Sequence, residues 1–431
     1  MWLIEDKFSG ILRSVSAQII KEVEKGFFLD ETLDHYFKEY RLSDSQKSLI
    51  YEITSGVIRW KGFLDHIVSK LIKRGIKDDI RYILWVSLYQ ISFMKKASYH
   101  VVNETVEYTK QEFGIYQSRF VNAILRRFVS NRDVFDLIRH SKHEIRDLAA
   151  FFSFPEWLIH RWINRFGRES AERLFDLLNK TPEFAIRVDT NMISRDEAAK
   201  ILEEDGIRTR KGVYSDFAIY VDKLMPVLKC QIFKKGLVSI QDETSQLATL
   251  AINPKKGDLI LDACAGRGTK TLHIKEIAPD ANVISMDNSI KRLKSLGHGT
   301  LSILGDALQN PFKKEYFDKI LIDAPCSSLG IIRKHPEIKW NRKEKDIIDY
   351  GNYQLELIDS LWDNLKTNGY IVYSVCSFEP EETHLVLESF KKRKMFALEN
   401  TLPFLFNKEY FQSLPQETGM DGFFIAKLKK L

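Results

Sequence analysis

The sequence predicts a multidomain protein with an N-terminal all-α bundle, a small α/β subdomain and a C-terminal α/β domain built on a doubly wound sheet. Three observations support this prediction. The 431 residues exceed one ordinary domain of about 100 to 200 residues. Apolar residues recur three and four positions apart through the first third of the chain, which is typical of helices. Short apolar runs then alternate with helical or loop segments, which is typical of a mostly parallel sheet.

Residues 1–140 are expected to form the all-α bundle. In the segment LSDSQKSLIYEITSGVIRW, Ser43 is predicted to cap a helix, because its hydroxyl can accept a hydrogen bond from a backbone N–H of the first turn. An apolar stripe follows at helical spacing and predicts the face that packs against the core. The stripe consists of Leu49, Ile50, Ile53, Val57 and Ile58.

Residues 141–235 are expected to form a connecting module that begins with the helix-like segments FPEWLIHRWINRF and AERLFDLLN. FAIRVDT then predicts a strand and ISRDEAAKILEEDG a capped helix, so a small α/β subdomain is expected there. From residue 236 to the end, the third domain contains five runs that predict strands of its sheet. These runs are DLILDA, NVISMD, LSILGD, KILIDA and YIVYSV.

The composition limits the classes of function. The four cysteines lie 34, 62 and 50 residues apart and match no CxxC zinc pattern, so neither a metal nor a disulfide framework is expected. The net charge of +6 is compatible with a polyanionic partner. The N-terminus MWLIEDKFSG carries acids where a signal peptide would be cationic, and no apolar stretch approaches about 20 residues. We therefore expect a cytoplasmic protein, and a monomer.

A glycine-rich turn, LDACAGRGTKT, follows the first expected strand of the third domain. Gly266 and Gly268 would let backbone N–H groups approach a ligand, and the helix that opens after them favours a carboxylate or phosphate. An ordinary turn would need glycine as often, and the spacing lacks the GxGxxG of NAD sites. Asp262, Asp287 and Asp306 end successive strands, and although each alone is as typical of a turn, together they favour an adenosyl ligand.

Cys326 in DAPCSSLG and Cys376 in YSVCSFEPEET each follow an apolar run, so both thiols are expected at the carboxyl ends of strands. Open α/β sheets bind their ligands at that edge. The serines that flank both cysteines are expected to leave the sulfur atoms accessible. Cys230 and Cys264, by contrast, fit the ordinary role of buried and inert thiols.

Two thiols beside an adenosyl sulfonium donor suit the methylation of a pyrimidine at carbon 5. That carbon is a poor nucleophile, so a thiolate must first add to carbon 6, and a second group must later assist loss of the carbon-5 proton and release of the enzyme. Asp323 could bind the pyrimidine N3 edge or the amino-acid part of the donor, and Pro325 stiffens the loop before Cys326. The basic residues 333–335 could hold phosphate oxygens or form a solvated loop.

At these motifs the chain resembles, over almost its whole length, the RsmB/Sun branch of the NOL1/NOP2/Sun family of RNA cytosine-5 methyltransferases. ACAGRGTKT is similar to the cofactor motif of the family, DAPCSSLGIIRKHPEIKW to its proline–cysteine motif, and YSVCSFEPEE to the motif with the nucleophile. IRVDT and LVSIQDETSQLA resemble its pre-catalytic segments. VNETVEY and RFVNAILRRF are similar to NusB, the RNA-binding helical fold at the N-terminus of this branch.

The resemblance implies a NusB-like helical domain, a Rossmann-like methyltransferase domain that uses S-adenosylmethionine, and a cytosine of small-subunit (16S) ribosomal RNA as the substrate. It also implies that Cys376 is the nucleophile and that Cys326 helps to resolve the covalent adduct. The residues implied to contact S-adenosylmethionine are Cys264, Ala265, Gly266, Arg267, Gly268, Thr269, Lys270, Asp287, Asp306 and Asp323.

Three features depart from the family pattern. Residues 266–269, Gly-Arg-Gly-Thr, replace the usual Ala-Pro-Gly-Gly and place a long cation in the turn. The interval of 19 residues from Asp287 to Asp306 is short, so the helix after the second strand is expected to have about one or two turns. Val375 replaces the threonine that usually precedes the nucleophile.

Two other classes of function stay open at this stage. An RNA-binding assembly or transcription factor would use the helical domain alone, although such a protein has no need of the thiols and acids in the C-terminal domain. A methyltransferase that acts on another RNA, on protein or on a small metabolite would explain the glycine-rich turn. Protein or metabolite substrates would leave the paired cysteines and the helical domain without a role.

Overall fold

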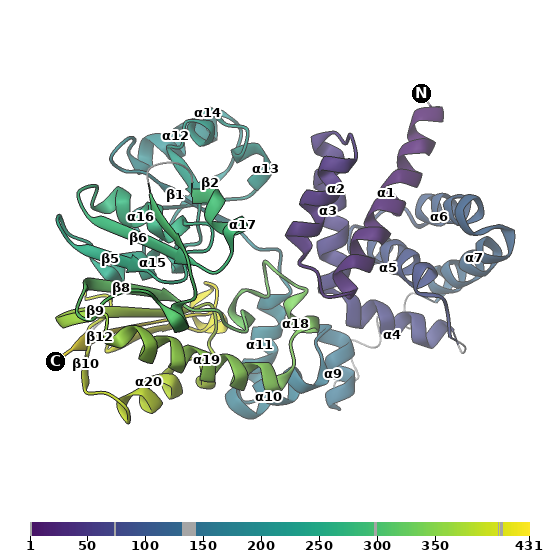
Figure 1. The fold of residues 1–431 in the computed structure, drawn as a ribbon. Helices are drawn as coiled ribbons and strands as arrows, with labels where there is room; N and C mark the ends of the chain where they lie inside the picture. The colour runs from purple at the N-terminus through teal and green to yellow at the C-terminus, as the bar shows by residue number, and fades with distance from the viewer. Residues whose placement is uncertain (1, 73–74, 132–143, 297–299, 404, 406–407) are drawn as a thin grey trace. The chain divides into compact units, whose positions relative to one another are not determined.

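The computed structural model describes residues 2–72, 75–131, 144–296, 300–403, 405 and 408–431, and the chain forms two compact units. The helical unit comprises Met1–Lys180 and Ile332–Arg342, and the sheet unit comprises Thr181–Ile331 and Lys343–Leu431 (Figure 1). Among the described residues, no helix combines the length and the apolar character needed to span a membrane.

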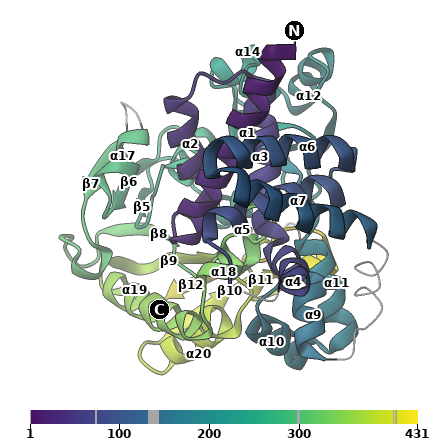
Figure 2. The ribbon, with the colours of Figure 1, turned by 90° about the vertical axis from the view of Figure 1, so that its right-hand side faces the viewer.

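The helical unit is a bundle in which α1, α3, α4, α6 and α7 pack against α5, which is buried along most of its length (Figure 2). Ser43 caps α3 as predicted, because its hydroxyl accepts from Gln46 N and the Gln46 side chain accepts from Ser43 N. Residues 132–140 of the expected bundle lie outside the described residues. The helices are α1 (Trp2–Glu24), α2 (Leu29–Glu39), α3 (Asp44–Arg59), α4 (Lys61–Leu71), α5 (Asp78–Ser92), α6 (Ser98–Phe113), α7 (Ile115–Ser130), α9 (Ile145–Phe152), α10 (Glu156–Phe166) and α11 (Arg168–Leu178).

A segment from the C-terminal half of the chain completes the helical unit. This segment, Ile332–Arg342, contains the short helix α18 (Ile338–Asn341). The buried ammonium group of Lys339 donates to the carbonyl oxygen of Arg59 at 2.8 Å and to Oδ1 of Asn179 at 3.0 Å. The basic residues 333–335, which could hold phosphate oxygens or form a solvated loop, therefore belong to the helical unit.

The small α/β subdomain belongs to the sheet unit. Its four strands pair antiparallel in the order β2-β3-β1-β4. The capped helix expected within ISRDEAAKILEEDG is confirmed as α12, and its cap is Ser194, which accepts from Glu197 N. The elements are β1 (Phe184–Val188), α12 (Arg195–Glu204), β2 (Thr209–Lys211), β3 (Ala218–Val221), α13 (Leu224–Val227), α14 (Gln231–Lys234) and β4 (Val238–Ile240).

The large sheet has the strand order β10-β12-β9-β8-β5-β6-β7, with β11 paired to β12. The strands β9, β8, β5, β6 and β7 are parallel, and β12 joins them antiparallel. The strands are β5 (Leu259–Asp262), β6 (Asn282–Asp287), β7 (Leu301–Leu304), β8 (Phe317–Asp323), β9 (Leu365–Val375), β10 (Phe396–Glu399), β11 (Tyr410–Ser413) and β12 (Phe423–Lys430).

Helices cover both faces of this sheet (Figure 1). Alternate strand residues point to opposite faces, so Ile320 packs in the cluster with α19 (Glu344–Trp362) and α20 (His384–Lys391), and Leu321 packs in the cluster with α15 (Glu243–Ile252) and α16 (Thr269–Ile277). Between β6 and β7, the described residues form α17 (Ile290–Leu293) and a 3-10 turn at Lys294–Leu296, which confirms the predicted short helix. The expected fold class is confirmed, whereas the domain boundaries at residues 140 and 235 stay predictions.

Candidate active site

The two predicted thiols lie next to each other. β8 ends at Asp323 and β9 ends at Val375, and these parallel strands are neighbours in register, with Asp323 opposite Ser374. Each strand leads into a loop that carries a cysteine, so Sγ of Cys326 and Sγ of Cys376 are 3.1 Å apart. The prediction that both thiols emerge at strand carboxyl ends is confirmed.

Backbone contacts hold the two cysteine loops together. Gly330 N donates to the carbonyl oxygen of Cys376 at 3.1 Å, and a Cβ atom at Gly330 would collide with the backbone of Gly422. Ser328 adopts the left-handed region with φ 62°, which is uncommon for a residue other than glycine and is concentrated at functional sites. Its hydroxyl lies 3.5 Å from Sγ of Cys376.

The two thiols differ in acidity. The hydrogen bond from the Cys326 thiol lowers the pKa of Cys376, and contact with the Ser328 hydroxyl adds to this effect, although burial opposes it. The pKa of Cys326 is raised well above its usual value by the same hydrogen bond and by burial. Cys376 is half-buried and Cys326 is buried, with 6% of its surface exposed. Ionisation of Cys376 is therefore favoured over ionisation of Cys326.

Both sulfur atoms were expected to be accessible between their flanking serines, but Cys326 is buried, whereas Cys376 is partly exposed. Ser327, Ser374 and Ser377 are fully buried because their hydroxyl groups bind carboxylates. Ser374 donates to Asp323, and the other two donate to Glu382, a buried residue that the sequence analysis did not single out. Glu382 lies in the segment YSVCSFEPEET. Several acidic residues close together are typical of an exposed surface, so the sequence did not indicate that Glu382 is buried.

Asp323 also binds Lys270, which comes from the first turn of α16. Nζ of Lys270 donates to Oδ2 of Asp323 at 2.5 Å, while Ser374 Oγ donates to Oδ1 at 2.9 Å. The positive charge of Lys270 acts to lower the pKa of Cys376, and the negative charge of Asp323 acts to raise it. The expected cofactor residues Lys270 and Asp323 thus lie in the electrostatic surroundings of the thiol pair.

The glycine-rich turn adopts a left-handed conformation that favours glycine. Gly266 has φ 56° and Gly268 has φ 80°, and a Cβ atom at Gly268 would overlap the side chain of Leu296. Gly266 N donates to Oδ2 of Asp287 at 2.9 Å, so the carboxylate at the end of β6 holds the turn that follows β5. Nothing lies within 4 Å of a Cβ atom placed on Gly266, which leaves space beside the turn for a ligand.

The polar groups around this turn fit an adenosyl ligand with an amino-acid tail. Asp262 is buried, Oδ2 accepts from Thr271, and Oδ1 has no hydrogen-bond partner among the residues that the structure describes. Burial raises the pKa of this carboxyl group to about 6. Asp287 is 5% exposed and accepts from Ser289 N as well as from Gly266 N. An unpartnered buried acceptor beside an open turn is the feature expected where a polar ligand completes the site.

The other expected cofactor residues differ in exposure. Ala265 is buried beside the turn, Thr269 begins α16, and the side chain of Arg267 is exposed. Cys264 is half-buried, and burial raises its pKa, as expected for an inert thiol. Asp306 is exposed and caps a short 3-10 helix by accepting from Leu308 N at 3.0 Å, which is the turn role that the sequence left open for it.

A buried arginine from the small subdomain supports the glycine-rich turn. Arg187 on β1 donates to both carboxylate oxygens of Glu276, to Gln241 and to the backbone oxygen of Thr269. Arg187 lies in the segment IRVDT, which resembles a pre-catalytic motif of the family. The sequence did not indicate that Arg187 binds Glu276, because the two residues are more than 80 positions apart.

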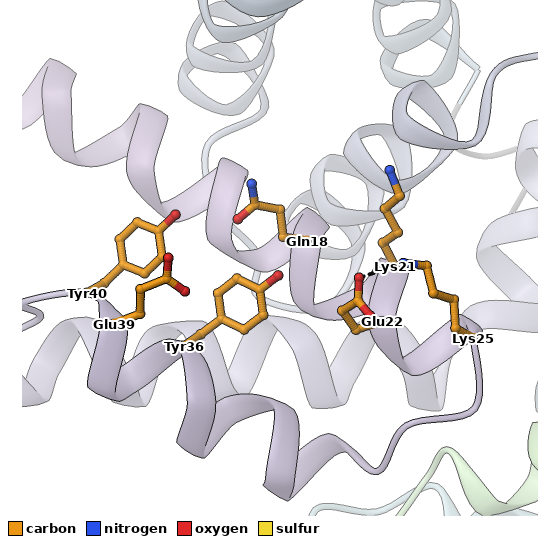
Figure 3. A pocket seen from close by; sticks show the side chains of 7 residues that line it. All are labelled: Gln18, Lys21, Glu22, Lys25, Tyr36, Glu39 and Tyr40. Atoms are coloured by element: carbon orange, nitrogen blue, oxygen red, sulfur yellow. Dashed lines mark hydrogen bonds and ion pairs between the residues drawn. The ribbon is translucent and has the colours of Figure 1, made fainter.

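A pocket of about 360 Å³ lies between α1 and α2 of the helical unit (Figure 3). The rings of Tyr36 and Tyr40 stack there with centroids 6.2 Å apart. Lys21 pairs with Asp79 and Lys25 with Glu22, so the pocket carries little free positive charge for a phosphate. Its lining residues are Gln18, Lys21, Glu22, Lys25, Tyr36, Glu39 and Tyr40.

Comparisons with known proteins agree with this architecture. Residues 249–429 match the family model "16S rRNA methyltransferase RsmB/F", residues 11–130 match the NusB family, and residues 154–228 match the ferredoxin-like domain of the RsmF/B-like methyltransferases. The chain is 33% identical over 435 residues to the ribosomal RNA small subunit methyltransferase B of Escherichia coli O6:K15:H31, covering 97% of this chain and 98% of that protein.

Two solved structures share the fold. The crystal structure of the protein PH0851 matches with a TM-score of 0.81 and 23% identity, covering 98% of this chain and 99% of that chain. The structure of NSun6 from Pyrococcus horikoshii with SFG matches with a TM-score of 0.58 and 22% identity, covering 64% of this chain and 98% of that chain.

Proposed function

The chain belongs to the family of ribosomal RNA small subunit methyltransferase B, and we propose that it methylates carbon 5 of a cytosine in 16S ribosomal RNA through a covalent adduct on Cys376. S-adenosylmethionine is the methyl donor of this family. The observation that carries the proposal is the pair of thiols of unequal acidity, 3.1 Å apart, at the edge where the glycine-rich turn also lies. A methyltransferase that attacked an already nucleophilic atom would have no use for this pair.

When bound, S-adenosylmethionine supplies an electrophilic methyl group. Asp287 is proposed to accept from its ribose hydroxyls, and the backbone of residues 264–268 to line it, because that turn leaves space at Gly266. The unpartnered Oδ1 of Asp262 is an acceptor available to the amino group of the donor. Asp306, which is exposed, and Asp323, which binds Lys270, are proposed to border the site.

The thiols divide the covalent chemistry. The thiolate of Cys376 forms a bond to carbon 6 of the cytosine, which makes carbon 5 nucleophilic. After carbon 5 has gained the methyl group, a base removes its proton, the bond from Sγ to carbon 6 breaks and the thiolate of Cys376 is regenerated. Cys326 lies within hydrogen-bond reach of the leaving sulfur and is proposed to assist this elimination by donating a hydrogen bond that stabilises the departing thiolate, while Cys326 keeps its proton.

Replacing each thiol separately tests the mechanism on 16S ribosomal RNA with labelled donor. Cys376→Ala is expected to abolish methylation while donor binding, measured by calorimetry, is retained. Cys326→Ala is expected to accumulate a protein–RNA adduct that survives a denaturing gel. Cys230→Ala serves as the control, because this thiol lies in the core of the small subdomain. If Cys326→Ala turns over normally and no adduct forms, the assigned division of labour is wrong.

A further inference from the structure

One buried carboxylate binds both cysteine loops. Glu382 lies in the 3-10 turn Pro380–Glu382 and is fully buried. Its Oε1 accepts from Ser327 N at 2.6 Å, and its Oε2 accepts from the hydroxyl groups of Ser327 at 2.5 Å and Ser377 at 2.6 Å. Ser327 directly follows Cys326 in the sequence, and Ser377 directly follows Cys376. The carboxylate therefore links the two cysteine loops through the residue that follows each cysteine.

Two further residues fix the carboxylate in place. Tyr373 donates to the backbone oxygen of Glu382 at 2.6 Å and is also bound to Oε1 of Gln354 at 2.9 Å. The amide of Gln354 donates to the backbone oxygen of Pro325 at 2.9 Å, just before Cys326, and lies 3.3 Å from Oε1 of Glu382. Glu382 is thus part of a connected network that ends on both loops and rests on the buried strand β9.

The nature of these contacts indicates a role in geometry. A buried carboxylate is costly, and burial raises the pKa of Glu382, so an apolar residue would stabilise the core more simply. An apolar side chain could not accept from one N–H and two hydroxyl groups at once. The bonds are short and directional, and they join loops that come from two different strands.

We propose that Glu382 is a positioning residue that sets the separation of the Cys326 and Cys376 sulfur atoms by binding the residue that follows each of them. The catalytic value of this separation rests on the proposed function, in which both thiols take part. The geometry itself can be measured without any methylation.

Phenylarsine oxide provides that measurement, because its arsenic bonds to two thiols at once with loss of water and so requires two sulfur atoms in contact. The full-length chain is expected to bind it through Cys326 and Cys376, and Cys326→Ser is expected to lose this binding. Glu382→Ala is expected to weaken the affinity at least about tenfold, because the pair is no longer preorganised. Glu382→Gln, which keeps one acceptor oxygen, should recover part of the affinity.

A matched control separates positioning from general loss of stability. Glu243 is also a buried carboxylate of the sheet unit, and it accepts from Tyr214 N, Ser215 N and the Tyr220 hydroxyl. Glu243→Ala removes a comparable set of bonds, none of which goes to a cysteine loop, so it should lower the melting temperature without changing arsenical affinity. Ser377→Ala removes a single bond to Glu382 and provides a milder variant if Glu382→Ala does not fold.

Methylation kinetics complete the test. Glu382→Ala and Ser377→Ala are expected to lower kcat, by about 100-fold for the former, while the affinity for S-adenosylmethionine is unchanged. Unchanged arsenical affinity in folded Glu382→Ala or Ser377→Ala would overturn the positioning role. If wild type forms no 5-methylcytosine but its arsenical affinity still depends on Glu382, the proposed function fails and the positioning role stands.

Discussion

Nη1 of Arg187 donates a hydrogen bond to the backbone oxygen of Thr269, 3.0 Å away. This contact links β1 of the small subdomain to the first residue of α16, directly after the glycine-rich turn. The guanidinium group is fully buried and is held by Glu276 through two further bonds of 2.8 and 2.6 Å. The small subdomain therefore contributes to the shape of the proposed cofactor site.

Replacing Arg187 should weaken donor binding. Arg187→Met removes the donor to Thr269 and leaves Glu276 without its partner, so we expect a loss of about 3–5 kcal/mol in stability. The affinity for S-adenosylmethionine, measured by calorimetry, should fall about fivefold to tenfold, since one hydrogen bond contributes about 1 kcal/mol.

The double variant Arg187→Met/Glu276→Gln separates these effects. It removes the uncompensated carboxylate, so stability should recover in part while the loss of donor affinity remains. Full recovery of affinity together with stability would show that Arg187 acts on the fold alone and has no specific effect on the turn.

Features of the sequence that act locally were predicted well. The caps at Ser43 and Ser194 need only a side chain and a backbone N–H a few residues away, and both are present. The strands before Cys326 and Cys376 are short buried apolar runs, so the position of both thiols at strand carboxyl ends followed from the pattern, whereas their 3.1 Å separation depends on β8 and β9 being neighbours.

Features that depend on distant partners were not predicted. Glu337 and Lys339 stand in the motif DAPCSSLGIIRKHPEIKW, and nothing in its pattern indicated that both are fully buried in the helical unit. Likewise, Ser327 and Ser377 are polar residues next to the cysteines, and the sequence did not indicate that both donate to the buried Glu382. Sequence patterns record which groups are polar, but only the fold determines which partner satisfies them.

The pair of Lys270 and Asp323 predicts opposite effects on the reactivity of Cys376. Loss of the cation in Lys270→Met should raise the pKa of Cys376, and loss of the anion in Asp323→Asn should lower it. Alkylation of Cys376 by iodoacetamide, followed by peptide mass spectrometry between pH 6 and 9, measures both shifts. The alkylation profile should move to higher pH in the first variant and to lower pH in the second. Shifts in the same direction would contradict the electrostatic account.

We expect His273 on α16 to make the stability of the sheet unit sensitive to acid. Its ring is fully buried, neither ring nitrogen has a hydrogen-bond partner among the described residues, and burial lowers its pKa to about 2. The unfolded chain takes up a proton near pH 6.5 that the folded chain cannot bind, so stability is lost as the pH falls below that value. At pH 5 this loss amounts to about 2 kcal/mol relative to pH 8.

His273→Leu should abolish that loss. Urea unfolding of wild type and variant at pH 8 and pH 5 gives the difference, in which any constant packing effect of leucine cancels. His100→Asn, at an exposed position, is the control and should leave the pH dependence unchanged. If wild type and His273→Leu lose stability in parallel between the two pH values, His273 does not remain neutral in the folded chain.

We expect Lys339 to hold the segment Ile332–Arg342 in the helical unit. Its ammonium group lies 4.0 Å from the centre of the Phe154 ring and donates to Arg59 O and Asn179 Oδ1. Lys339→Met leaves both acceptors buried without a donor, so we expect a loss of about 1–3 kcal/mol for each. Hydrogen exchange of residues 332–342 should become faster, whereas Lys345→Met, at an exposed position, should not change it.

Because the segment begins six residues after Cys326, the arsenical affinity of the thiol pair shows whether the loosening reaches that loop. Unchanged exchange in Lys339→Met would mean that the bonds of Trp340 and Glu337 suffice to hold the segment.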